Sequence, residues 1–316
     1  MKKLMPVLAS PARLVRIGIL LAALGGGAAL MARASQEQKR HTIRSRTDMV
    51  TILASVTDAN GRPIPALTQD AFQLSEEGVP QKLAFFESQT DRPLDLALMI
   101  DSSLSAYKEL HFEGDAAGHF IQQVVRPGDM LAVFEFSETV TRLADFTDNI
   151  PALQSAVRKM TSGTGTSLYD AVVLGSHSLM RRPLGRRRAV VIVTDAGETT
   201  SVSKFEDARH AAVVSGTLLY TIVVRPVKNE NGRNTAGEHA LITITDSVGG
   251  AMYILDDLTQ IQEMFDRINR ELRTQYLLGY YPQPTPPPAS DRHVHLDVKG
   301  NYVVRSRTEY ETPTAD

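Results

Sequence analysis

The strongest constraint on the fold is a set of short, nearly continuous apolar runs separated by helical patterns. Leu94–Ile100 (LDLALMI), Ala189–Thr194 (AVVIVT) and Leu218–Val224 (LLYTIVV) are almost entirely apolar. A strand shows this pattern when both faces of its sheet are covered. The stretches between the runs space apolar residues as a helix does. Alternating strands and helices predict an α/β fold, with a doubly wound, mostly parallel sheet covered by helices on both faces.

The two flanks of this region read as β-structure. Alternating or short apolar runs occur on both sides, and each flank holds too few apolar residues to fold alone. The runs are Val50–Val56, Phe72–Ser75, Lys82–Glu87, Gln275–Tyr281, His293–Val298 and Tyr302–Arg307. We therefore expect the flanks to pair as a small split β module into which the α/β domain is inserted. The expected boundaries are 48–92 and 275–310 for the module, 93–274 for the α/β domain and 311–316 for a tail.

The N-terminus has the pattern of an export signal. Residues 1–34 hold five Lys or Arg and no acidic residue, and the 15 residues of Ile17–Met31 carry no charge. The apolar run ends at Ala32-Arg33-Ala34, a small-x-small cleavage pattern, and it is short for a membrane-spanning helix. We expect a signal peptide over 1–34 that is cleaved after Ala34, a flexible tether over 35–47, and a periplasmic or extracellular protein. The alternative is an uncleaved membrane anchor.

Composition excludes several classes of function. The chain has no cysteine, so disulfides, cysteine-ligated metals and cysteine nucleophiles are excluded. Without residues 1–34 the chain has 29 basic and 36 acidic residues. This acidic balance argues against a nucleic-acid partner, which would require a basic surface.

Oxygen-bearing side chains follow the ends of two buried strands. Asp101-Ser102-Ser103-Leu104-Ser105 follows the first, Asp195 follows the second, and the loop Gly163-Thr164-Gly165-Thr166-Ser167 lies between them in the sequence. Ligands of open α/β sheets bind at the carboxyl ends of the strands, where such loops converge. Carboxylates and hydroxyls are hard oxygen ligands that suit Mg²⁺. The alternative is that Asp-x-Ser-x-Ser only caps a helix.

These residues resemble a known metal site. Asp-x-Ser-x-Ser after a strand, a Thr in a Gly-Thr loop and Thr-Asp after a later strand resemble the metal-ion-dependent adhesion site of von Willebrand factor type A (VWFA, or vWA) domains, which have a Rossmann-like fold. The resemblance implies Mg²⁺ (or Mn²⁺) held by five ligands: Asp101, Ser103, Ser105, Thr166 and Asp195. Residues 56–87, the segment ELRTQYLLGYYP (271–282) and the strand VRSRTEY (304–310) resemble the acidobacterial-type VWFA-related proteins.

Two departures from the resembled site concern its loops. Leu104 stands where such domains commonly carry Gly, and Ala196-Gly197-Glu198 follows Asp195 where Gly-Glu-Asp is more usual. Neither departure replaces a ligand. A bulky Leu104 could tilt the loop and weaken metal binding, so a degenerate site without an ion is the alternative.

Other polar groups are weaker candidates. His293 and His295 alternate with apolar residues on a strand and should face solvent. The basic run Arg181, Arg182, Arg186, Arg187 and Arg188 is expected to be a solvated loop beside an aggregation-prone strand, or to bind an anionic partner. Ser176-His177-Ser178 lies within a helix and lacks a nucleophile elbow, and Glu198 is expected to be a loop carboxylate.

The function implied by the resemblance is an exported binding or adhesion module without catalytic activity. A protein partner would supply a Glu or Asp carboxylate to the bound metal, and a membrane contact is expected only if the N-terminal segment is uncleaved. Two alternatives remain. A metal-assisted hydrolase would use the same oxygen cluster but needs a base and an oxyanion clamp, and a metal-free structural scaffold of the envelope needs neither.

Overall fold

The computed structural model describes residues 49–88, 90–103, 110–225 and 234–314. Residues Asp48–Asp316 form one compact unit. The expected signal peptide and tether lie outside the described residues, as do Leu104 and Ser105. No helix in the described part of the chain is both long and apolar enough to cross a membrane.

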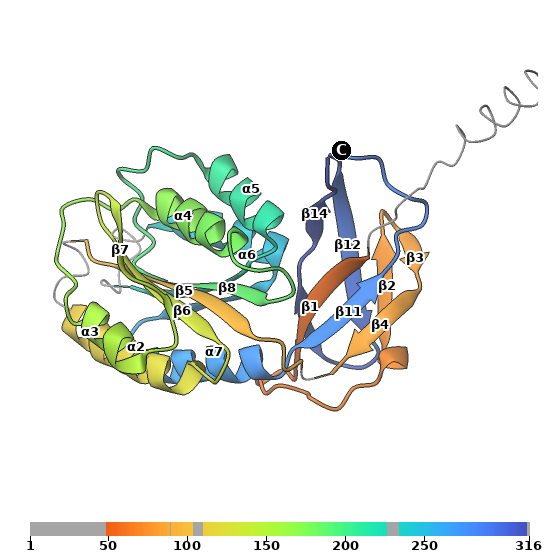
Figure 1. The fold of residues 1–316 in the computed structure, drawn as a ribbon, viewed down its shortest axis with the longest axis horizontal. Coiled ribbons are helices and arrows are strands. Elements are labelled where there is room, and N and C mark those ends of the chain that lie inside the picture. Colours follow the sequence, from red (N-terminus) through yellow and green to blue (C-terminus); the bar gives the residue numbers. More distant parts are fainter. Residues whose placement is uncertain (1–48, 89, 104–109, 226–233, 315–316) are drawn as a thin grey trace, which may run out of the picture. The chain divides into compact units, whose positions relative to one another are not determined.

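A mixed sheet forms the centre of the α/β domain (Figure 1). Within the described ranges it has six strands in the order β10-β9-β8-β5-β6-β7. All neighbours run parallel except β7, which pairs with β6 in the antiparallel direction. The strands are β5 (Leu94–Asp101), β6 (Met130–Phe136), β7 (Val140–Thr147), β8 (Arg187–Thr194), β9 (Leu218–Val224) and β10 (Gly250–Leu255). The predicted fold class is confirmed.

Helices cover both faces of this sheet. Side chains of β5 alternate between two cores: Leu98 packs with α2, α3 and α7 on one face, and Met99 packs with α4, α5 and α6 on the other. In the first core the rings of Phe120 and Phe265 stack with their centroids 4.6 Å apart. The helices are α2 (Leu110–Val124), α3 (Ile150–Val157), α4 (Leu168–Met180), α5 (Phe205–Ser215), α6 (Thr235–Val248) and α7 (Ile261–Arg273), the last preceded by the 3₁₀ turn η4 (Leu258–Gln260).

The sequence patterns did not predict four of the elements. Strand β7 is an edge strand whose residues are half-buried or exposed, so it lacks a clear apolar face. Helix α6 contains Gly and several β-branched residues, which are weak helix formers, and β10 is short and begins at a glycine. The fourth element, β3 (Val79–Gln81), has Pro80 at its centre and lies at a sheet edge, where proline is tolerated.

The flanking segments pair across the whole length of the chain. They form two four-stranded sheets within the described residues, in the orders β13-β1-β11-β4 and β14-β12-β2-β3. Ile52 lies opposite Leu278, and both contribute to the core between the sheets. The remaining bounds are β1 (Val50–Thr57), η2 (Gln69–Ala71), β2 (Phe72–Glu76), β4 (Leu83–Glu87), β11 (Tyr276–Tyr280), β12 (Asp291–Val298), β13 (Val303–Ser306) and β14 (Glu309–Glu311). The run predicted as one strand over 302–307 is therefore followed by a separate short strand.

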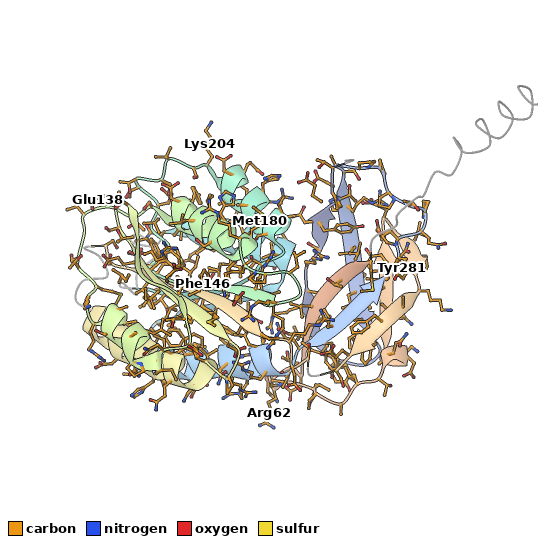
Figure 2. All side chains as sticks on the ribbon, viewed as in Figure 1. Arg62, Glu138, Phe146, Met180, Lys204 and Tyr281 are labelled. Atoms are coloured by element: carbon orange, nitrogen blue, oxygen red, sulfur yellow. The ribbon has the colours of Figure 1, made fainter. Side chains whose placement is uncertain are left out.

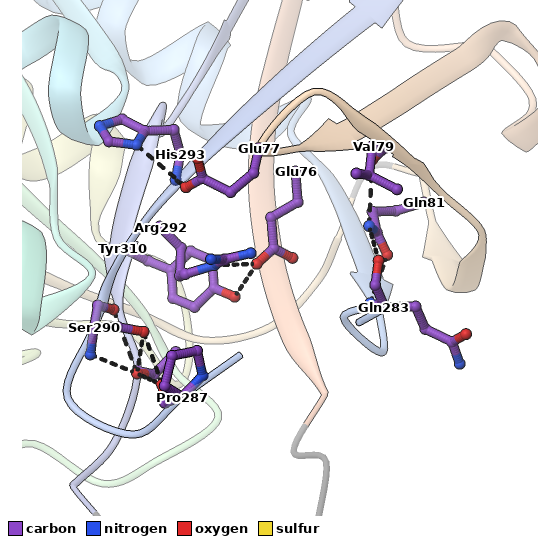
Figure 3. Close-up of polar contacts among 11 residues, drawn as sticks. Glu76, Glu77, Val79, Gln81, Gln283, Pro287, Ser290, Arg292, His293 and Tyr310 are labelled. Atoms are coloured by element: carbon purple, nitrogen blue, oxygen red, sulfur yellow. Dashed lines mark hydrogen bonds and ion pairs between the residues drawn. The ribbon is translucent and has the colours of Figure 1, made fainter. Parts of the chain in front are cut away.

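A buried carboxylate joins three strands of this β module (Figure 3). Arg292 Nε donates to Glu76 Oε1 at 2.7 Å, and the Tyr310 hydroxyl donates to the same oxygen at 3.1 Å. Glu76 is 1% exposed, so loss of either donor would leave a buried charge short of partners. His293 and His295 are exposed, as expected.

Polar contacts also connect the α/β domain to the β module. Glu271, near the end of α7, is 1% exposed and accepts a hydrogen bond from Arg305 of β13. Burial raises the pKa of Glu271, and the charge of Arg305 opposes that rise. Arg209 of α5 forms an ion pair with Glu309 of β14 at 2.5 Å. These contacts fix the junction through side chains that are far apart in the sequence.

Candidate metal centre

Asp101 is the last residue of β5, and its carboxylate is fully buried. The Ser103 N–H donates to its Oδ1 at 2.9 Å, and the Thr194 hydroxyl donates to its Oδ2 at 2.6 Å. Thr194 is the last residue of β8, which runs parallel to β5. The carboxyl ends of neighbouring parallel strands therefore hold Asp101 in place, as expected for a site at this edge of the sheet.

Thr166 and Asp195 come together beside Gly197. A Cβ atom added at Gly197 would lie 2.9 Å from Asp195 Oδ1 and 3.3 Å from Thr166 Oγ1. Both oxygens therefore lie close to one point in space, although 29 positions separate the two residues. The Gly197 N–H donates to Asp195 Oδ1 at 2.8 Å and orients the carboxylate.

The loop that carries Thr166 is anchored to its neighbours. The Gly163 N–H donates to the Ser102 carbonyl at 2.9 Å, and Ser103 forms a bridge with Gly163. The Ser167 hydroxyl donates to the Ser137 carbonyl at 2.7 Å. These bonds bring the loop to the segments that follow β5 and β6, so Ser103 and Thr166 belong to adjoining segments.

Three residues at this site were not predicted from the sequence. Thr194 orients Asp101, and the Asn234 side chain donates to the Asp195 carbonyl at 3.1 Å. Glu138 lies at the tip of the β6–β7 hairpin (Figure 2). Its carboxylate accepts a hydrogen bond from the Thr164 hydroxyl. Thr194 stands directly before Asp195 in the sequence and could have been found from that position. Asn234 and Glu138 carry no local signal.

Electrostatics at Asp101 favour a nearby positive charge. The pKa of Asp101 is raised to about 6: burial is the largest cause and the charge of Asp195 adds to it, while the hydrogen bonds from Thr194 and Ser103 oppose it. A cation bound beside Asp101 would favour the ionised form of this carboxyl group.

The donor set fits a hard divalent cation. It offers two carboxylates and neutral hydroxyls, with no sulfur or imidazole ligand, as Mg²⁺ or Mn²⁺ requires. Within the described residues, no three His, Cys, Asp or Glu side chains are grouped so that they could hold a metal ion. A site here therefore depends on the hydroxyl oxygens as well as on the two aspartates.

The structure does not place all the predicted ligands, and it gives other candidates different roles. Ser105 lies outside the described residues. Glu198 accepts hydrogen bonds from the Tyr169 N–H at 3.0 Å and the Ser201 hydroxyl at 2.7 Å, so it joins a loop to the start of α4. His177 lies within α4, as its sequence context suggested.

Comparisons with known proteins give a family match and similar solved structures. Residues 95–267 match the model of the von Willebrand factor type A domain family. The chain is similar to the solved structure "von Willebrand factor type A from Catenulispora acidiphila", with 11% identity, 87% of this chain and 76% of that chain covered, and a TM-score of 0.51. It is also similar to the solved structure of BatB from Bacteroides thetaiotaomicron, with 15% identity and a TM-score of 0.43. That similarity covers 55% of this chain and 98% of BatB. A search of the curated proteins finds no match.

The fold and the family match define the class of protein. The chain belongs to the von Willebrand factor type A domain family, with the family domain over residues 95–267. Domains of this family commonly serve adhesion and protein–protein interaction. The narrower resemblance to the acidobacterial-type proteins stays a prediction.

Proposed function

We propose that this protein is an exported, non-catalytic module that binds a protein partner through Mg²⁺ (or Mn²⁺). Asp101, Ser103, Ser105, Thr166 and Asp195 would hold the ion, directly or through water. The observation that supports this most is the convergence at the sheet edge. Asp101 is held there by Thr194 at 2.6 Å, and Thr166 and Asp195 face one point beside Gly197.

The incomplete coordination of the ion indicates the chemistry of the partner. Two carboxylates and neutral hydroxyls would leave a divalent ion with an incompletely satisfied coordination shell, and Mg²⁺ usually keeps exchangeable waters. A Glu or Asp carboxylate of a protein partner is the natural replacement for one of them. A bound ion would supply a positive site for that carboxylate, and the residues at the sheet edge would determine where it lies.

Two observations favour binding over hydrolysis. Glu198, the carboxylate that follows Asp195 most closely in the sequence, accepts hydrogen bonds from Tyr169 and Ser201. A hydrolase would also need a clamp for the developing charge, and the described side chains around Asp101 and Asp195 include no arginine or lysine hydrogen-bonded to them.

A pull-down from envelope extract, with and without EDTA, tests this proposal. Wild-type protein should capture a partner in Mg²⁺ and release it in EDTA, whereas Asp101→Ala should capture nothing. Asp145→Ala is the matched control, because Asp145 is exposed on β7 and pairs with Arg142 at 3.2 Å. Capture that is indifferent to EDTA would support a metal-free scaffold, and turnover of a phosphoester or peptide would support the hydrolase.

A further inference from the structure

A narrow cleft lies where the amino-terminal ends of β8 and β9 approach the β module, and arginines dominate it. The cleft has a volume of about 210 Å³. The described residues that line it include five arginines and neither Asp nor Glu. The arginines are Arg92, Arg186, Arg187, Arg188 and Arg307.

Three of these guanidinium groups bond to neutral oxygens. Arg187 Nε donates to the Arg92 carbonyl at 2.8 Å, and its Nη1 donates to Gln275 Oε1 at 3.1 Å. Arg188 Nη1 donates to the Ser215 carbonyl at 2.9 Å, and Arg307 donates to the Thr51 carbonyl. Within the described chain no carboxylate lies within ion-pair distance of these three.

The other two arginines have acidic partners that lie outside the cleft. Arg186 Nε bonds to Asp95 at 2.8 Å, and Arg182 shares that carboxylate at 3.1 Å. Arg92 lies 3.8 Å from Glu87. Two positive charges therefore share Asp95, which leaves the surroundings of the cleft with an excess of positive charge.

Helix ends account for part of this arrangement. Arg188 bonds to carbonyls at the ends of α4 and α5, where the helix dipole places a partial negative charge. A partial charge does not neutralise a full one. Burial lowers the pKa of Arg187 to about 10 and also lowers the pKa values of Arg188 and Arg307. The charges of Asp129 and Asp95 oppose this shift at Arg187 and Arg188, respectively.

Two of the guanidinium groups also keep donors that are not used within the protein. The Nε atoms of Arg188 and Arg307 are buried and have no hydrogen-bond partner in the described part of the chain. A buried N–H donor without a partner is costly, and a guanidinium donor is suited to the oxygens of phosphate. Two residues that line the cleft therefore each retain an unused guanidinium donor.

We propose that this arginine cleft binds a phosphate group. The volume of about 210 Å³ admits a tetrahedral oxyanion and is smaller than a typical pocket for a larger organic ligand. The expectation that the basic run is a solvated loop is wrong for Arg187 and Arg188, which lie in β8: Arg187 is 4% exposed, and Arg188 is half-buried. The site lies apart from the candidate metal centre, which is at the carboxyl ends of the same strands.

The phosphate could be free or could belong to a lipid headgroup. Leu184 lines the cleft and is 92% exposed, in the turn between α4 and β8. An apolar side chain among arginines at the mouth of a phosphate site would suit the surface of an anionic bilayer. The two sources share one binding chemistry and differ in their dependence on Leu184.

Calorimetric titration of the full chain with inorganic phosphate tests the proposal. EDTA should be present to keep metal ions out of the other site, and chloride at equal ionic strength is the reference. We expect saturable binding that Arg188→Gln weakens by about tenfold or more, because a charge-assisted donor is lost. Arg142→Gln, on β7 and outside the cleft, should bind as wild type does.

Arg188 also holds two helix ends, so its variant could fail to fold. Arg92→Gln is the second test, because that side chain is 38% exposed and its ion pair is long. It should fold normally and weaken phosphate binding by roughly threefold, as expected for a more exposed charge. Binding that is unchanged in folded Arg188→Gln or in Arg92→Gln would overturn the proposal.

Vesicles distinguish the two sources of phosphate. Phosphatidylcholine vesicles with phosphatidic acid are compared with phosphatidylcholine alone in a co-sedimentation assay. A lipid headgroup is identified if the wild-type protein binds selectively to the vesicles with phosphatidic acid and Leu184→Ser reduces this binding. The Leu184→Ser protein should then bind inorganic phosphate as wild type does. Phosphate binding without selectivity for vesicles identifies a free phosphate. Absence of binding to both probes by wild-type protein would refute the site.

Discussion

Replacing Asp101 by Asn should stabilise the protein when no metal ion is bound. Burial raises the pKa of Asp101 from the usual 3.8 to about 6. The unfolded chain therefore ionises at lower pH than the folded protein does, and ionisation favours unfolding. The contribution of the protonated Asp101 carboxyl to the free energy of unfolding is therefore fully present below about pH 4. This contribution is lost as the pH rises through about 6.

The magnitude follows from the two pKa values. Each tenfold change in a proton-binding constant is worth about 1.4 kcal/mol. The rise in the pKa of Asp101 from 3.8 to about 6 therefore lowers the free energy of unfolding of the wild-type protein. The loss is about 3 kcal/mol near pH 7.5 and about 0.5 kcal/mol near pH 4. The Asn amide keeps the shape of the carboxyl and one acceptor for the Ser103 N–H. For a chain of this size the gain near pH 7.5 corresponds to roughly 5–10 °C in melting temperature.

Urea unfolding in EDTA, followed by circular dichroism near pH 4 and near pH 7.5, measures the effect. Asp101→Asn should be more stable than wild type at the higher pH and similar to it at the lower pH. Asp145→Asn, at an exposed position, should show no such difference. If Asp101→Asn in EDTA is no more stable than wild type near pH 7.5, the charge of Asp101 is already compensated and the reasoning fails.

Four further predictions concern other parts of the molecule. Mg²⁺ should raise the melting temperature of wild type by mass action and leave Asp101→Ala unchanged; equal shifts in both proteins would contradict metal binding at this site. Arg305→Met should lower the free energy of unfolding by about 2–4 kcal/mol, because Glu271 stays buried without its partner, and an unchanged urea midpoint would contradict this. A chain ending at Thr274 should exchange amide hydrogens rapidly across β1, since β11 would be missing; retained protection would show that β1 does not need β11. N-terminal sequencing of the native protein should begin at Ser35, whereas a start at Met1 in the membrane fraction would favour the anchor.

The sequence by itself determined the fold class and the strand ends that carry the candidate site. A strand buried on both faces must be apolar throughout, so β5, β8 and β9 could be read directly from the composition of their runs. A residue such as Asp101 or Asp195 at the end of such a strand has only one edge of the sheet to occupy. These features depend on local pattern and on chain direction, which the sequence contains.

Only the tertiary structure decided which distant residues meet. Asn234 and Glu138 approach the site from elements that were not predicted, because β7 and α6 are stabilised by packing and not by their own propensity. The sequence of the arginine run does not distinguish solvated arginines from buried ones. Its burial follows from the ends of α4 and α5 and from the β module, and Arg307 reaches the cleft from the opposite end of the chain. Long-range contacts of this kind have no periodic pattern in the sequence, so they appear only when the chain has folded.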